Sequence, residues 1–240
     1  MAFQRVMRKM AVIFFAIAVG SFQLTAQHRK LQNLPYVDNK VIHFGFTVGF
    51  HTQDLLLTQS GSENEDGEVW FSEIPNYSPG FSVGLIADLY LSHFVNLRLI
   101  PTIHLGSKDF VFKEQTSGEE FKTGIRNNYV TLPLQLKFNG GRIDNYRPYV
   151  IAGGYGSLEV ASRKNQPVLL KPFDFGIEVG FGCDFYLPYF KLSPELKFTF
   201  GLTDVLEQNR DDLVNRELMK YSQSLSKAVQ RMIVLSFNFE

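Results

Sequence analysis

The side chains that could support catalysis or metal binding are few and widely spaced. His104 and Ser107 lie close together, as a base and a nucleophile of a lipid hydrolase would, but no carboxylate stands beside them to orient the imidazole. His43 and His51 share one face of an extended segment, roughly 26 Å apart at about 3.3 Å per residue, so they cannot share a metal ion. Cys183 lies in an apolar stretch, where a thiol is inert. We expect no enzyme activity, cofactor, metal or small-molecule substrate.

Charged residues gather in two predicted loops. Four carboxylates surround Gly67 without the spacing of an EF-hand, so a solvated acidic loop explains them more simply than a divalent-cation site. Three basic residues in a later loop could contact lipopolysaccharide phosphates. The acidic set is Glu63, Glu65, Asp66 and Glu68, and the basic set is Arg163, Lys164 and Lys171.

The composition excludes several classes of protein. Among 240 residues, 24 Lys and Arg balance 24 Asp and Glu. The chain therefore lacks the net positive charge that is typical of proteins that bind nucleic acid. A mean hydropathy of -0.07, without an apolar run of about 18 residues, excludes a bundle of membrane-spanning helices. The 23 Phe and 10 Tyr beside a single Trp are more than a soluble enzyme of this size needs.

The first 26 residues are typical of a secretory signal peptide. Arg5, Arg8 and Lys9 precede the apolar run 11–20, and Leu24-Thr25-Ala26 resembles a cleavage site. The apolar run is too short to span a bilayer, and no cysteine near the cut offers a lipid anchor. We expect residues 1–26 to be removed, residues 27–40 to form a periplasmic N-terminal segment and residues 41–240 to form the main domain.

Beyond residue 41 the apolar residues recur with period two, which is the signature of strands. In the segment from Phe173 to Phe185, apolar residues occupy every second position, and the positions between them hold glycines and charged residues such as Asp174. Eight such segments are found: 42–50, 81–90, 96–105, 130–138, 149–160, 173–185, 195–202 and 233–239. Between them, long and short connections alternate without exception. Short turns at one end and long loops at the other are typical of an outer-membrane barrel.

The two faces of these segments differ in chemistry. One face is nearly uncharged, as lipid contact requires, and the other carries glycines and charges of both signs, as the interior of a narrow barrel does. Aromatic residues near the strand ends suit interfacial girdles. We therefore predict an all-β fold: an eight-stranded antiparallel up-and-down transmembrane β-barrel, plugged by its own side chains. The predicted interior polar network consists of Asp88, Arg98, Lys137, Glu178, Glu195 and Lys197.

The last long loop carries an amphipathic pattern. Apolar residues at helical spacing predict a short helix, which would be extracellular. The helix could fold over the mouth of the barrel or dock a partner protein, and the sequence does not separate the two. The apolar positions are Val214, Leu218, Tyr221 and Leu225.

Two stretches at the ends of the mature chain resemble one family. Leu31-Gln32-Asn33-Leu34-Pro35-Tyr36, with Asp38 and Lys40 and then His43-Phe44-Gly45-Phe46, Gly49-Phe50 and Asp54, is similar to PorT, a small outer-membrane barrel associated with the type IX secretion system. The stretch from Arg231 to Glu240 resembles the C-terminus of that family, and 129–134 fits the wider class of barrels. Many such barrels end on an aromatic residue, whereas here Glu240 follows Phe239.

The resemblance implies a role and a location. It implies a subunit or assembly factor for export of cargo with C-terminal sorting domains, in the outer membrane with both termini periplasmic, together with other secretion proteins and membrane lipids. The alternatives are a stand-alone structural barrel that stabilises the envelope and a lipid-modifying enzyme. Fold alone does not decide among them.

Overall fold

The chain divides into two units, residues 1–32 and 33–240. The computed structural model describes residues 32–61, 68–73, 79–115, 118–161, 168–208, 221–222 and 224–240. Several expectations lie outside these residues: the signal peptide, most of the acidic loop, the basic pair of the later loop and two positions of the predicted helix. The individual positions are Glu63, Glu65, Asp66, Arg163, Lys164, Val214 and Leu218.

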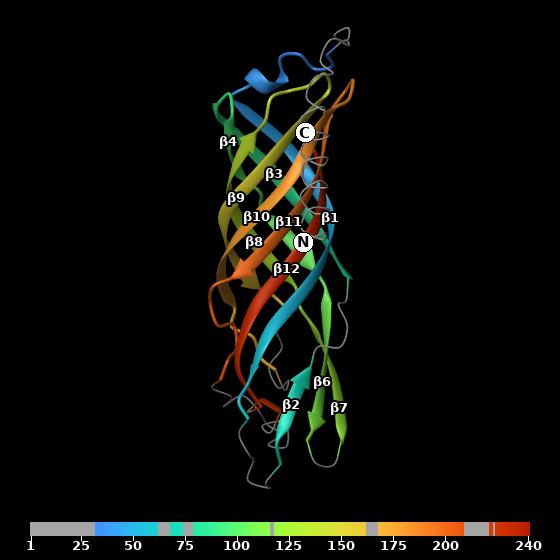
Figure 1. Cartoon of the computed structure of the whole chain (residues 1–240), viewed down its shortest axis with the longest axis vertical. Helices are drawn as coiled ribbons and strands as arrows, with labels where there is room; N and C mark the ends of the chain where they lie inside the picture. Colours follow the sequence, from blue (N-terminus) through green and yellow to red (C-terminus); the bar gives the residue numbers. More distant parts are fainter. Residues whose placement is uncertain are drawn as a thin grey trace, which may run out of the picture. The chain divides into compact units, whose positions relative to one another are not determined.

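The described part of the second unit contains a closed ring of antiparallel strands. Each of the eight predicted segments lies in a strand of the ring, and the segment 96–105 is divided into two short strands. The strands are β1 (Ile42–Gln59), β3 (Pro79–Ser92), β4 (Val95–Leu99) with β5 (Thr102–Leu105), β8 (Tyr129–Asn139), β9 (Tyr146–Glu159), β10 (Phe173–Tyr186), β11 (Lys191–Gly201) and β12 (Leu225–Phe239). The ring closes because β1 pairs with β12 on one edge and with β3 on the other. The predicted eight-stranded barrel is confirmed (Figure 1).

The break between β4 and β5 falls at Ile100 and Pro101. A proline has no N–H to give to the sheet, so the ladder is interrupted there. The Pro101 carbonyl still accepts from the Leu85 N–H at 3.0 Å, which holds the two halves in one line.

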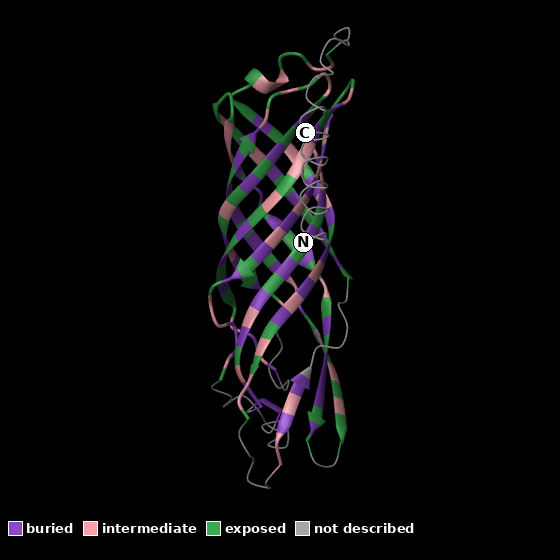
Figure 2. Ribbon diagram, in the orientation of Figure 1, coloured by how far each residue is buried: buried purple, intermediate pink, exposed green. Residues whose placement is uncertain are grey.

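Buried and exposed residues alternate along every long strand, as Figure 2 shows. The pattern of β8 is strict from Tyr129 to Asn139. Outward positions are large and apolar, including Leu132 and Leu134, which are more than half exposed, and inward positions such as Gln135 and Lys137 are buried. This inverted arrangement, apolar outside and polar inside, suits a barrel surrounded by lipid. Among the described residues no helix is long and apolar enough to cross a bilayer.

A second, three-stranded sheet lies in two connections that we predicted to be loops. It consists of β2 (Trp70–Glu73), β6 (Ser107–Glu114) and β7 (Glu120–Arg126), in the order β2-β6-β7. The long connections expected between segments 42–50 and 81–90 and between segments 96–105 and 130–138 therefore contain strands and are not loops throughout. These strands are short and their apolar residues come in runs, such as Phe110-Val111-Phe112, rather than in alternation. In β6 the period-two signal is lost because the charged residues Lys108 and Glu114 occupy buried positions and Val111 is buried on the opposite face.

The final strand also starts earlier than predicted. Leu225 begins β12 and pairs with Gln59 of β1, so it is a strand residue and not the end of a helix. The expected helical phase fails at Leu225 because β1 extends to Gln59 and offers backbone partners that far along the chain.

Candidate functional site

The barrel interior near the short turns is filled by a lattice of ion pairs. Arg98 is fully buried and bonds three carboxylates: Asp88 at 3.2 Å, Glu195 at 3.0 Å and Glu240 at 3.1 Å. These acids come from β3, β11 and the residue after β12, so one guanidinium joins strands from around the ring. Its planar fork of donors allows this, whereas an ammonium would act as a single point charge.

Two lysines complete the lattice. Lys137 contacts Asp184 at 2.7 Å, and Lys191 contacts Glu240 at 2.6 Å. Tyr149 donates its hydroxyl to Glu195 at 2.7 Å, and its ring lies 4.0 Å from the Lys137 ammonium. Each charged side chain of this lattice is therefore paired with an opposite charge, as burial requires.

The structure places all six predicted interior residues inside the barrel. Glu178 accepts a hydrogen bond from Gln135 at 2.5 Å, and Lys197 lies 3.6 Å from Glu195. The predicted set lacked Asp184, Lys191 and Glu240, which also belong to the lattice. Lys191 shares the strand face of Glu195, so continuing the alternation backward could have found it. No spacing in the sequence indicates the partner of Glu240.

The lattice and its surroundings leave little space. A cavity of about 20 Å³ lies further along the axis, between His104, Glu178 and Lys197. A volume of that size holds about one water molecule. Buried side chains thus occupy the described interior around this cavity, the arrangement expected of a barrel plugged by its own side chains.

The histidines form a contact that sequence spacing did not predict. His104 bonds Ser82 at 2.8 Å and Thr131 at 3.1 Å, and Ser82 also bonds His51 at 2.7 Å. Ser107, the expected neighbour of His104, instead starts β6. Ser82 thus has a base beside it, but it is buried, and no carboxylate among the described residues bonds either imidazole. In the described residues no three His, Cys, Asp or Glu side chains gather to hold a metal.

An apolar cap covers the other end of the barrel, where the long connections lie. Phe112, Phe121 and Tyr221 pack against one another, with the Phe121 and Tyr221 rings stacked 4.4 Å apart. Leu225 and Trp70 belong to the same cluster. The two described positions of the predicted helix are thus buried within the protein's own cap.

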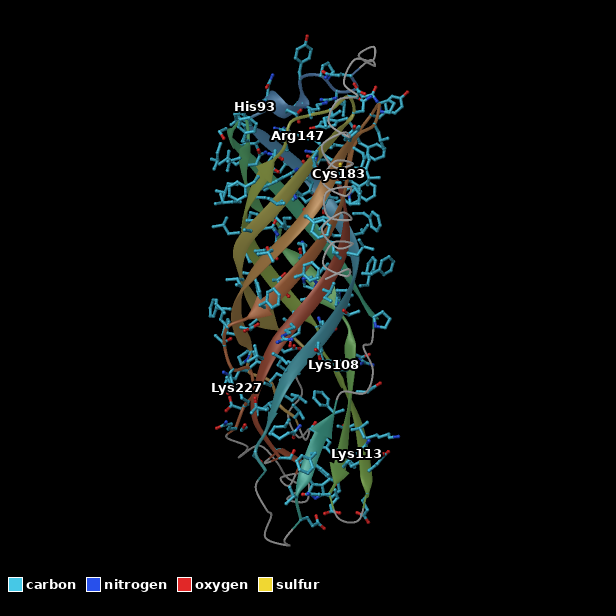
Figure 3. All side chains as sticks on the ribbon, in the orientation of Figure 1. His93, Lys108, Lys113, Arg147, Cys183 and Lys227 are labelled. Carbon is cyan, nitrogen blue, oxygen red and sulfur yellow. The ribbon has the colours of Figure 1, made fainter. Side chains whose placement is uncertain are left out.

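Cys183 is half-buried on the outer face of β10, in the barrel wall (Figure 3).

A lid closes the short-turn end. The segment from Asn33 to the 3₁₀ helix η2 (Val37–Asn39) is held by Arg142, which bonds the Leu34 carbonyl at 3.3 Å and Asp38 at 3.4 Å. The same guanidinium lies 3.6 Å above the Tyr186 ring, and the Tyr186 hydroxyl donates to Asp38 at 2.7 Å. Arg147, labelled in Figure 3, lies 3.7 Å from Asp38. The stretch that carries the family resemblance is therefore fixed to the barrel.

Comparison with protein families agrees with this architecture. A family model described as an outer membrane protein beta-barrel domain matches residues 25–207. No curated protein matches the chain. Similar solved structures include OprG from Pseudomonas aeruginosa, 13% identical over 82% of this chain and 94% of that chain with a TM-score of 0.43. Another is Neisserial surface protein A, 9% identical over 83% and 98% with a TM-score of 0.41.

Proposed function

This chain belongs to the family of outer membrane proteins with a β-barrel domain. We propose that it acts in the outer membrane as a subunit or assembly factor of the type IX secretion system. Its task would be to support export of cargo with C-terminal sorting domains. The filled interior carries this proposal, since a barrel without a passage acts through its surfaces. The choice of secretion rests on the resemblance of the 31–54 stretch and the last ten residues to the PorT family.

The lid is the part of the resembling stretch best suited to meet other secretion proteins. It is ordered by contacts to Arg142 and Tyr186, yet Tyr36 on it is 79% exposed. Short turns are periplasmic in barrels of this kind, so we place the lid and Glu240 in the periplasm and the cap outside the cell.

The four positions of the predicted helix play a different part in this proposal. Tyr221 and Leu225 are buried in the cap, which favours the cap as their role over partner docking. Partner contact through Val214 and Leu218 stays a prediction, because these residues lie outside the described part of the chain.

The test is deletion followed by fractionation. Cargo proteins with the C-terminal sorting domain should accumulate unprocessed in the periplasm of the deletion strain, and the intact gene should restore their export. A strain that expresses the barrel without residues 32–39 separates the lid from the barrel. Unchanged export in the deletion strain contradicts the secretion role.

A stand-alone structural barrel is the second candidate, favoured by the dense ion-pair lattice. It predicts a fragile envelope with normal export, and no large protein that co-purifies. A lipid-modifying activity through His104 and Ser82 would instead change the membrane lipids in a His104→Ala strain.

A further inference from the structure

A buried lysine, amide and carboxylate meet where the small sheet joins the barrel. Lys108 is the second residue of β6, Asn127 follows β7, and Glu159 ends β9. Their exposed fractions are 2%, 0% and 7%. Figure 3 labels Lys108 at this junction and Lys113 further out on the same strand. Water is therefore excluded from three groups that can react with one another.

The Asn127 amide is oriented by its neighbours. Its oxygen accepts from the Lys108 ammonium or amine Nζ at 2.8 Å, and its nitrogen donates to Glu159 Oε2 at 2.5 Å and to the Tyr129 hydroxyl at 2.7 Å. The other oxygen of Glu159 accepts from the backbone N–H groups of Asn128 at 3.3 Å and Ala161 at 3.0 Å. The carboxylate is thus fixed on the nitrogen side of the amide and the lysine on its oxygen side.

The lysine is prepared to act as a nucleophile. Burial lowers the pKa of Lys108 from 10.5 to about 7, although Glu159 and Asp54 oppose the shift, so much of the side chain is a neutral amine at neutral pH. A C=O bond is about 1.23 Å long, so the Asn127 Cγ lies at most about 4.0 Å from Nζ. Reacting atoms meet at about 3–3.5 Å, which a small side-chain movement reaches.

We propose that Lys108 and Asn127 become joined by an amide bond between Nζ and Cγ. The Nζ lone pair attacks Cγ and forms a tetrahedral intermediate. The Glu159 carboxylate takes a proton from Nζ of this intermediate and passes it to the amide nitrogen. The C–N bond of the old amide then breaks, the C=O bond re-forms, and ammonia leaves. A primary amine and a carboxamide thus become a secondary amide and ammonia, with no oxidant, reductant or further reactant.

The bond would fix the cap to the barrel. Lys108 and Asn127 stand at the two ends of the β6–β7 hairpin, so the amide closes the hairpin where it meets β8. A covalent closure of this kind restricts the unfolded chain and stabilises the folded one. Lys113 of the same strand lacks the arrangement, because it is exposed and faces the carboxylate of Glu120 at 3.7 Å.

Mass spectrometry of the full protein purified from outer membranes tests the proposal. We expect an intact mass lower than that of the processed chain by one ammonia, and a branched peptide in which the Lys108 and Asn127 fragments stay linked after digestion. A succinimide at Asn127 loses the same mass but gives no branched peptide, and that result overturns the proposal, as does the full mass.

Variants assign the roles. Lys108→Arg and Asn127→Ala should retain the ammonia, and Glu159→Gln should leave the two side chains unjoined. The matched control Lys113→Arg should lose ammonia as the natural chain does. If a variant fails to fold, the branched peptide of the natural protein alone decides, because its absence from folded protein contradicts the bond.

Discussion

Removing the Arg98 guanidinium should destabilise the barrel more than any other single change in its interior. In Arg98→Met, Asp88, Glu195 and Glu240 lose a cation at 3.0 to 3.2 Å, and none of these side chains is more than 2% exposed. Glu240 keeps Lys191 and Glu195 keeps the Tyr149 hydroxyl, whereas Asp88 keeps a neutral partner, the Asn96 amide at 2.5 Å. Leaving buried charge unpaired costs about 3–5 kcal/mol.

The effect is measurable by urea unfolding in detergent micelles, with folded and unfolded forms separated by gel mobility. For a slope of about 2 kcal/mol per molar, the midpoint should fall by about 2 M. Arg98→Met with Asp88→Asn should recover part of the loss, since the second change removes the stranded charge. Lys113→Met, at an exposed pair, should leave the midpoint unchanged. Equal midpoints for Arg98→Met and the natural chain would refute the reasoning.

Four further outcomes follow from the same geometry. Leu132→Arg puts a charge on the lipid face and should cost about 2–4 kcal/mol near the bilayer centre, measured by the same unfolding assay, whereas Leu132→Phe should cost little. Gly153→Ala should disturb the pairing of β8 with β9, because an added Cβ would clash with the Leu134 carbonyl oxygen. The yield of folded protein measures the effect, and a yield equal to that of the natural chain would contradict the expectation. Arg142→Ala should expose the lid to protease without changing the gel mobility of the folded barrel, and equal protection in both proteins would show that the lid is held by other contacts. In Asn127→Ala the Lys108 amine stays unjoined, and burial lowers its pKa to about 7 in the folded protein. Between pH 7 and 10.5 Lys108 then binds fewer protons in the folded chain than in the unfolded chain, so the free energy of unfolding should rise with pH across that range. A free energy of unfolding that does not change with pH would place the amine in water.

The barrel was predictable from the sequence because its lipid face imposes strict alternation. Phe173 to Phe185 in β10 shows how one apolar residue at every second position fixes both the strand and its outward face. The small sheet was not predictable in this way, since Phe110 and Phe112 are buried on one side of β6 and Val111 is buried as well.

The site was predictable only as a set of residues. Alternation places Arg98, Lys137 and Glu195 inside, because the inward face follows from the outward one. Their partners depend on the register between strands and on which strands face each other across the ring. The contact of His51 with His104 through Ser82, and the meeting of Lys108 with Asn127, arise from that geometry and have no signal in local spacing.

The central claim is a sealed barrel that works through its surfaces, and conductance in planar lipid bilayers tests it most directly. The purified full-length protein should leave the current at its baseline across the applied voltages, because the ion-pair lattice fills the interior near the short turns and the apolar cluster packs among the long connections. Stable, repeated single-channel steps from the folded protein would contradict the claim.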